Sequence, residues 1–185
     1  MKRGKISKEK IIAAFLKVSF DKSSSGTALS DIADAIGIKK ASLYNYYENR
    51  DAIVIDVLEF CRSELRTLSF PNVDELSEFS VGLFRAFDTQ KNLEIFSFID
   101  SEKLFDDSAF EIFEEFKISL IKILHPNLNE RAEFFVSALI FLLSEYISAK
   151  KMMARNGEEI EFSEAKIKAL VGVFRSSAQI KNVQK

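Results

Sequence analysis

The chain has 185 residues, of which 47% are hydrophobic and 29% are charged, and its formal net charge is −2. This composition provides a packed core and excludes a disordered polar chain. One cysteine, Cys61, and one histidine, His125, exclude a disulfide framework and a multi-cysteine zinc site, so we expect no metal and no cofactor. With no secretory signal and no apolar run of about 18 residues, we expect a cytoplasmic protein that does not span a membrane.

Apolar residues recur at helical spacing along most of the chain, and no segment alternates as a strand does. Ser7 is placed to cap the first helix, and a serine-rich stretch ending at Gly26 follows that helix. Pro71, Pro126 and Gly157 are expected to end later helices. We therefore predict an all-α protein with helices at about 7–22, 29–36, 39–47, 49–68, 74–89, 92–105, 108–124, 129–155 and 163–181.

Charge and phenylalanine are unevenly distributed. Residues 1–50 contain ten basic and five acidic residues, whereas residues 51–185 contain 16 basic and 23 acidic ones. Sixteen of the 18 phenylalanines also follow residue 50. A basic N-terminal region suits a polyanionic partner, although charge alone would equally suit a solvated arm. We predict two domains, residues 1–50 and 51–185, joined by the helix at about 49–68.

The two short helices on either side of Gly37 form the most informative pattern. Glycine adopts the left-handed conformation that ends a helix without steric cost. The surrounding apolar residues can form one shared face: Ile32, Ile36, Ile38, Leu43 and Tyr46. This is the pattern of a helix-turn-helix motif, whose second helix enters the DNA major groove, although any corner of two helices needs the same spacing. The second helix carries donors and hydroxyls and no carboxylate before Glu48, which favours DNA.

Residues 7–58 resemble the DNA-binding domain of TetR-type (tetracycline-repressor-like) transcriptional regulators. The resemblance rests on these segments: Ile11-Ile-Ala-Ala14, Thr27, Asp31-Ile-Ala33, Gly37-Ile-Lys-Lys-Ala-Ser-Leu-Tyr44, Tyr46-Tyr47 and Asn49-Arg50. It implies a helical regulator without enzymatic activity, whose C-terminal domain binds a ligand and dimerises. Ala28 departs from the family, which often has Ser or Thr there to cap the second helix. We expect Thr27 or Ser30 to cap it instead, or the end to be weaker by about 1 kcal/mol.

The resemblance also implies which residues contact DNA. The expected base readers are Lys39, Ser42, Tyr44 and Asn45. Lysine suits guanine and asparagine suits adenine. The expected phosphate contacts, which position the protein without specifying sequence, are Thr27, Lys40, Tyr46 and Arg50. The basic residues of the N-terminal arm could follow the DNA backbone or a minor groove, or belong to a solvated tail: Lys2, Arg3, Lys5 and Lys8.

The last two predicted helices are apolar on most sides. Such helices must be buried on most sides, so we expect them to form a homodimer interface, with burial inside the monomer as the alternative. A dimer suits a palindromic operator. A largely apolar small-molecule pocket is expected among phenylalanines that ordinary core packing would also use: Phe84, Phe87, Phe96, Phe98, Phe105, Phe113, Phe116 and Phe141.

These observations predict a dimeric repressor that a small molecule releases from its operator. Two other classes share the same features. One is a DNA-associated structural protein that acts through a protein partner, and the other is a ligand-binding helical protein that no longer reads DNA. The sequence lacks a Gly-rich phosphate loop, a His-Glu-x-x-His motif and a Cys-x-x-Cys motif, so we do not expect an enzyme.

Overall fold

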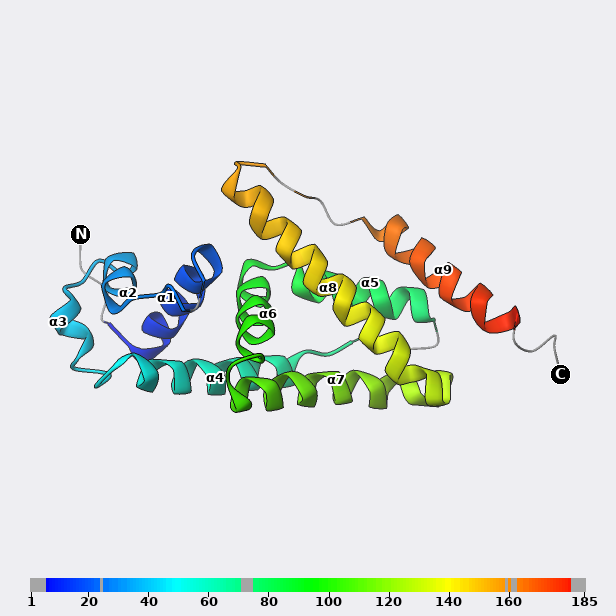
Figure 1. Ribbon diagram of the computed structural model, residues 1–185, viewed down its shortest axis with the longest axis horizontal. Helices are drawn as coiled ribbons and strands as arrows, with labels where there is room; N and C mark the ends of the chain where they lie inside the picture. Colours follow the sequence, from blue (N-terminus) through cyan, green and yellow to red (C-terminus); the bar gives the residue numbers. More distant parts are fainter. Residues whose placement is uncertain (1–5, 24, 71–74, 159, 161–162, 181–185) are drawn as a thin grey trace. The chain divides into compact units, whose positions relative to one another are not determined.

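A computed structural model of the chain describes residues 6–23, 25–70, 75–158, 160 and 163–180, with side chains up to Phe174 (Figure 1). Over these ranges the chain forms helices and no strand, which confirms the predicted all-α fold. The helices are α1 Lys8–Asp21, α2 Leu29–Ala35, α3 Lys40–Leu43, α4 Arg50–Thr67, α5 Leu76–Phe87, α6 Gln90–Glu102, α7 Asp107–Leu128, the 3₁₀ turn η1 Asn129–Arg131, α8 Ala132–Arg155 and α9 Glu164–Ile180.

The helices pack into two compact units. The first unit comprises Met1–Thr67 with Leu93–Phe116, and therefore contains α1–α4, most of α6 and the beginning of α7. The second unit comprises Leu68–Asn92 with Lys117–Lys185, and contains α5, the end of α7, α8 and α9. Packing thus groups the N-terminal helices with later segments of the chain, while the predicted functional division near residue 50 stays a prediction.

The first unit has a core built around α1. Ser7 caps α1 as predicted, because its side chain accepts a hydrogen bond from the amide of Lys10. The buried ring of Phe15 meets that of Phe98 of α6 edge to face, with 5.8 Å between centroids. Phe96 packs against Phe113 and Phe116. Aromatic contacts of this kind add to the burial of the rings and fix α6 against its neighbours in this unit.

Glycine ends two helices as the sequence predicts. Gly37 has a φ of 69°, and the amide of Ile38 donates back to the carbonyl of Ala33 at 2.9 Å. Gly157, with a φ of 74°, ends α8, where the amide of Glu158 donates to the carbonyl of Met153 at 3.0 Å. Both conformations are strained for residues with a Cβ, so glycine suits these turns.

The start of α2 differs from the expectation that Thr27 or Ser30 would cap it. Ala28 is the N-cap residue and no side chain caps the helix from that position. Instead, the carboxylate of Asp31 accepts the amide of Ala28 at 3.1 Å. An acidic residue at the third helical position often reaches back in this way, so one exposed donor at this end is satisfied without a hydroxyl.

The end of α7 is also corrected by the structure. Pro126 lies inside α7 and does not end it. The helix ends at Leu128, and Asn129 then takes a left-handed conformation with a φ of 49° before α8 begins. Proline disfavours helical backbone at the residue before it and removes one amide donor, and α7 continues past these costs. A residue in the left-handed conformation, by contrast, changes the direction of the backbone and ends the helix. Asparagine tolerates that conformation better than most residues, so the break falls at Asn129.

The stretch Asp107–Arg155 is long and apolar enough to cross a membrane by length and composition, with a mean hydropathy of 1.5 in its best window. This finding differs from the expectation that no such stretch exists. The stretch is two helices, separated at Asn129. The buried side chains of α8 recur at helical spacing, as in a core helix of a folded domain: Ala132, Phe135, Val136, Leu139, Ile140, Leu143 and Ile147.

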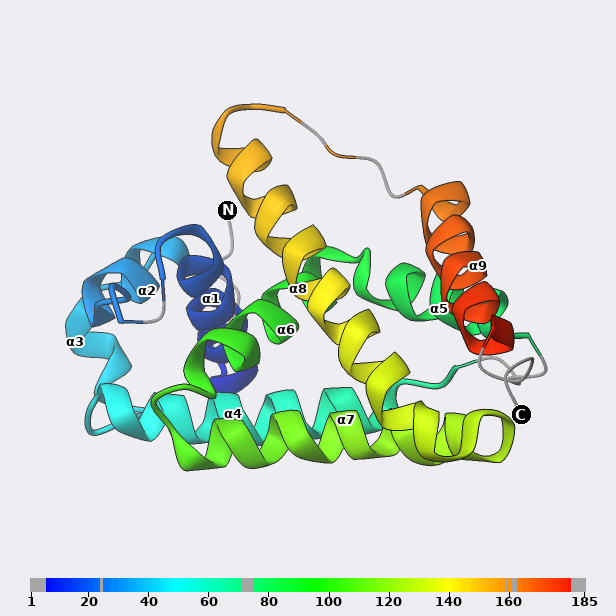
Figure 2. The same ribbon diagram turned by 45° about the vertical axis from the view of Figure 1, so that its right-hand side comes forward.

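In the second unit, α5 lies beside α9 (Figure 2). Two ion pairs join these helices, one between Lys168 and Glu78 at 2.7 Å and one between Arg85 and Glu164. Exposed ion pairs of this kind contribute little to stability, so packing of the buried face of α5 holds the unit together. Seven residues form that face: Leu76, Phe79, Ser80, Val81, Leu83, Phe84 and Phe87.

Candidate nucleic-acid interface

The helix α3 presents polar side chains around one apolar anchor. Leu43 is buried and is the only buried residue among the four of α3. Lys39, Lys40 and Asn45 are exposed, and Tyr44 is 52% exposed. Ser42, the remaining expected base reader, is partly buried. The amides of residues 46 and 47 both donate to the carbonyl of Leu43, so α3 ends in a turn and is shorter than the predicted 39–47.

The four expected phosphate contacts differ in their surroundings. Thr27 is 2% exposed, and its hydroxyl donates to the carbonyl of Ser23 at 2.8 Å. Nε of Arg50 donates to the carbonyl of Thr27 at 3.1 Å, and its guanidinium lies 5.5 Å from the ring centroid of Phe15. Lys40 is exposed. The structure therefore brings Arg50 and Thr27 together as part of the scaffold, while their contact with phosphate stays a prediction.

A cluster of three side chains fastens α1 to α4. Nζ of Lys8 lies 2.9 Å from Oδ2 of Asp56 and 4.7 Å from the ring centroid of Tyr47. The hydroxyl of Tyr47 donates to the same carboxylate oxygen at 2.9 Å. Burial, followed by the hydrogen bond to Asp56, raises the pKa of Tyr47. The hydrogen bond from Lys8 lowers the pKa of Asp56 although burial acts the other way, so this ion pair is charged at neutral pH.

This cluster was not predicted from the sequence, because Lys8 was expected to belong to the basic arm. No local pattern links Lys8 to Asp56, which lies 48 residues further along the chain. A second cation of the N-terminal helices is paired in the same way, since Lys22 lies 2.7 Å from Asp31. The hydrogen bond from Lys22, and then that from the amide of Ala28, lower the pKa of Asp31. Lys8 and Lys22, like Arg50, therefore make contacts within the domain itself.

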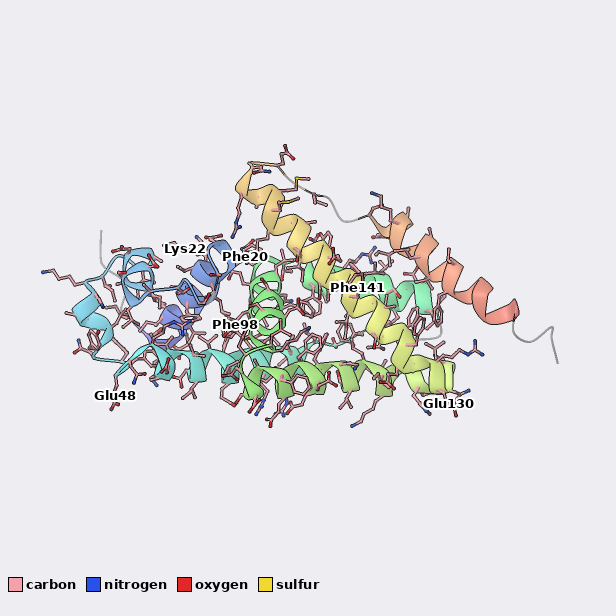
Figure 3. All side chains as sticks on the ribbon, in the orientation of Figure 1. Phe20, Lys22, Glu48, Phe98, Glu130 and Phe141 are labelled. Carbon is pink, nitrogen blue, oxygen red and sulfur yellow. The ribbon has the colours of Figure 1, made fainter. Side chains whose placement is uncertain are left out.

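The expected ligand-pocket residues fall into three groups. Phe96, Phe98, Phe113 and Phe116 are buried in the first unit, and Phe84 and Phe87 are buried in the second. Phe105 is 85% exposed and Phe141 is 64% exposed. Figure 3 labels Phe98 on α6 and Phe141 on α8. The eight residues thus do not form one cluster within either unit, and their contact with a ligand stays a prediction.

A polar cluster lies beside Phe84 in the second unit. The ring of Phe84 is 6.0 Å from that of Tyr146, whose hydroxyl donates to Asp88 at 2.6 Å. Lys150 pairs with the same carboxylate. Burial alone would raise the pKa of Asp88. The hydrogen bonds from Lys150 and Tyr146 outweigh burial, so the pKa is lowered. This cluster ties the end of α5 to α8 and was not signalled by any sequence motif.

The remaining candidate for chemistry is Cys61, which is buried in α4. Burial raises the pKa of its thiol, so the thiol is protonated at neutral pH and lacks the thiolate character of a redox sensor. Among the residues whose positions are described, no three His, Cys, Asp or Glu side chains are grouped to hold a metal ion.

Comparison with known proteins identifies the class of the N-terminal helices. Residues 11–57 match the family model for bacterial regulatory proteins of the tetR family. The match runs from α1 into α4 and includes all eight expected DNA-contacting residues. These helices are therefore a helix-turn-helix DNA-binding domain. Residues 11–57 are therefore similar to the DNA-binding domain of the TetR family of bacterial regulators.

One curated relative shares the N-terminal region. The biofilm operon icaADBC HTH-type negative transcriptional regulator IcaR of Staphylococcus epidermidis is 41% identical over 54 residues. The alignment covers 29% of this chain and 29% of that relative. The similarity in sequence is therefore confined to less than a third of each protein.

Solved structures share the fold over nearly the whole chain. A transcriptional regulator from Rhodococcus sp. Rha1 superposes with a TM-score of 0.69 and 12% identity, covering 91% of this chain and 95% of that one. The multidrug binding protein EbrR, in complex with imidazole, gives a TM-score of 0.61 and 13% identity, covering 91% and 94%. At these identities the likeness extends to the fold alone.

Proposed function

We propose that this protein is a transcriptional repressor that binds a palindromic DNA operator as a homodimer. The observation that carries the proposal is the surface of α3, where Leu43 is buried and Lys39, Tyr44 and Asn45 are exposed, within a TetR-family domain. IcaR, which is similar over this region, is a negative regulator, and this supports repression. Acting on DNA, the protein works in the bacterial cytoplasm.

The proposed contacts follow from side-chain chemistry. Lys39 offers a cation to guanine O6 and N7, and Asn45 offers an amide to adenine N6 and N7. Tyr44 lies between them in sequence with its ring exposed, which suits a thymine methyl group or a sugar. Lys40, which is exposed at the beginning of α3, supplies a phosphate contact that fixes the register without reading bases.

The homodimer is proposed to form through α8 and α9. These helices leave five large apolar side chains exposed in the single chain: Phe134, Phe141, Met152, Leu170 and Val173. A monomeric protein rarely exposes so many large apolar side chains on two consecutive helices, so a second copy of the chain is the partner that we expect to cover them. Exposure of these residues argues against the alternative in which both helices are buried within the monomer.

The effector is proposed to be a small, largely apolar molecule. The EbrR structure shares the fold of this chain and holds imidazole in a protein described as multidrug binding. Phe84 and Phe87, with the polar pair of Tyr146 and Asp88 beside them, supply the mixture of apolar and polar groups that small-molecule sites use. The effector must bind one dimer geometry better than the other, since otherwise it cannot change DNA affinity.

The first test measures binding of the full-length protein to DNA from upstream of its own gene and to a scrambled fragment, each over a range of salt concentrations. A preference of about 10³-fold or more for the upstream fragment is expected of a specific regulator. Equal affinity for the two fragments that decreases steeply with salt would contradict the proposed regulator and would favour a DNA-associated structural protein. No binding to either fragment would favour a ligand-binding protein that no longer reads DNA.

Two substitutions then separate reading from positioning. Asn45→Ala should lose about 1–3 kcal/mol of discrimination at one base pair of each half-site. Lys40→Ala should weaken binding to all sequences and reduce the salt slope by about 0.9 for each phosphate that is no longer neutralised. Lys122→Ala, at an exposed lysine of α7, is the control and should change neither quantity. If Asn45→Ala leaves the preference among base-pair variants unchanged, Asn45 does not read a base.

The dimer is tested with Phe141→Glu, read by analytical ultracentrifugation and by operator binding. A charge on the exposed face of α8 should convert the dimer to a monomer and abolish operator binding, while the helical circular dichroism signal is retained. Phe105→Glu, at an exposed phenylalanine of the first unit, is the matched control and should leave the dimer intact. If Phe105→Glu dissociates the homodimer and Phe141→Glu does not, the interface lies elsewhere.

A further inference from the structure

The helix α3 is short and depends on its surroundings for its direction. It comprises four residues, of which Leu43 is buried. It packs beside α2, and in Figure 1 it lies between α2 and the beginning of α4. Helix formation is cooperative, and helices as short as this one are marginal without tertiary packing. The orientation of α3 must therefore be set by contacts of the residues that flank it.

Two successive tyrosines follow α3 and are bonded to other segments of the same domain. The amides of Tyr46 and Tyr47 both donate to the carbonyl of Leu43, so the two residues move with α3. The hydroxyl of Tyr46 donates to the carbonyl of Ile6, just before α1, at 3.1 Å. The hydroxyl of Tyr47 donates to Oδ2 of Asp56, in α4, at 2.9 Å. The end of α3 is therefore tied to the beginning of α1 by one tyrosine and to α4 by the next.

The carboxylate that accepts from Tyr47 is itself held by a cation. Nζ of Lys8 lies 2.9 Å from the same Oδ2 of Asp56 and 4.7 Å from the ring centroid of Tyr47. A charged acceptor makes a stronger hydrogen bond than a neutral one. Tyr47 is 5% exposed, so it has almost no surface to offer to DNA. An effect of this hydroxyl on DNA binding must therefore pass through the residues that it positions.

Base reading requires an accurate placement of the end of α3. Asn45 directly precedes Tyr46 in the chain. Hydrogen bonds are made at donor–acceptor distances of about 2.7–3.2 Å, and recognition groups must be held to within about 0.5 Å. A displacement of about 1 Å would therefore misalign the Asn45 amide with a base edge. The long, flexible side chain of Lys40 could still follow a phosphate after the same displacement.

We propose that Tyr46 and Tyr47 are positioning residues that fix the end of α3, so that Asn45 meets its base without a contact between either hydroxyl and DNA. The inference rests on the proposed DNA-binding function and deepens it, because it names residues that determine specificity from within the domain. Removing either hydroxyl should lower the discrimination between base pairs more than it lowers the affinity for non-specific DNA.

The test uses the full-length protein, its preferred operator fragment and a fragment in which the base pair read by Asn45 is replaced. Discrimination is the ratio of the two affinities. One well-placed bidentate contact gives about 5–150-fold discrimination, so Tyr47→Phe should lower the ratio by about threefold or more. The change keeps the ring and the net charge, so the slope of log affinity against log salt should stay at its wild-type value. Tyr46→Phe should act in the same direction.

A double-mutant cycle tests the connection to α4. Asp56→Ala removes the acceptor of the Tyr47 hydroxyl and should lower the discrimination ratio as Tyr47→Phe does. The double variant should lose no more than the larger of the two single losses, because both changes break the same bond. Asp51→Ala makes the same change in charge at an exposed carboxylate in the first turn of α4, and as the control should leave the ratio unchanged.

The outcomes separate a positioning role from the alternatives. A less stable Tyr47→Phe protein that keeps its full discrimination ratio would show a purely structural role and would overturn the inference. If Tyr46→Phe weakens binding to operator and non-specific DNA equally, its hydroxyl contacts a phosphate directly, and the role assigned to Tyr46 is wrong. A wild-type protein without sequence preference would contradict the proposed function itself, and the positioning role would fall with it.

Discussion

The helices α3 and α8 use apolar side chains in opposite ways. In α3 one buried leucine, Leu43, holds the helix, and the large exposed side chains beside it, Lys39, Lys40, Tyr44 and Asn45, carry polar groups. In α8 seven buried residues hold the helix, and the exposed residues include Phe134 and Phe141. The proposed role of α3 in DNA binding therefore rests on polar groups whose spacing is visible in the sequence. The proposed role of α8 in the dimer rests on which apolar groups the fold leaves uncovered.

The largest expected effects come from the leucines that anchor these two helices. Leu43→Ala and Leu143→Ala each remove a fully buried side chain and should lower the free energy of unfolding by about 2–5 kcal/mol, as measured with urea. Leu104→Ala makes the same change at a side chain that is 73% exposed, and should cost within about 0.5 kcal/mol. Equal losses at Leu143 and Leu104 would contradict the division between buried and exposed residues.

The next effect concerns the glycines that end α2 and α8. A Cβ at Gly37 or Gly157 meets no atom within 4 Å, so the cost of alanine is that of the left-handed backbone, about 1–2 kcal/mol. Gly37→Ala should also reduce operator affinity, whereas Gly157→Ala should not. Gly172→Ala, inside α9 and free of that strain, should stabilise the protein by about 0.5–1 kcal/mol, and unfolding with urea measures all three changes.

The smallest effect is a pH dependence to which one partly buried carboxylate in each unit contributes. The pKa values of Asp56 and Asp88 are both below the ordinary 3.8, so each contributes stability above that pH and loses it as pH falls through the lowered pKa. Unfolding followed between about pH 5 and 2 should show this loss. Asp56→Asn and Asp88→Asn should each make the free energy of unfolding depend less steeply on pH. If neither variant changes that dependence, other carboxylates are responsible for it.

Much of the N-terminal domain could be predicted because its signals are local. Ser7 caps the helix that follows it, and Gly37 takes the left-handed conformation that its place between two helices requires. Each depends on a few neighbouring residues and on hydrogen bonds within one turn. The residues proposed to read bases belong to the same short segment, so they could be proposed from the sequence.

Contacts between distant segments could not be predicted in this way. Nothing near Lys8 indicates Asp56, and nothing near Tyr46 indicates the carbonyl of Ile6. The break after α7 was placed at Pro126 because proline is the stronger local signal, but the chain reverses at Asn129. In each case packing selected among conformations that the local sequence allows.

The all-α fold, the turn at Gly37 and the family of the N-terminal domain could be predicted from short segments, because helical periodicity, capping and turn geometry are local properties. That Phe98 is buried against Phe15 while Phe105 and Phe141 are exposed follows from tertiary packing. A phenylalanine has the same preference for burial wherever it occurs, and the packing of whole helices determines which ones are covered.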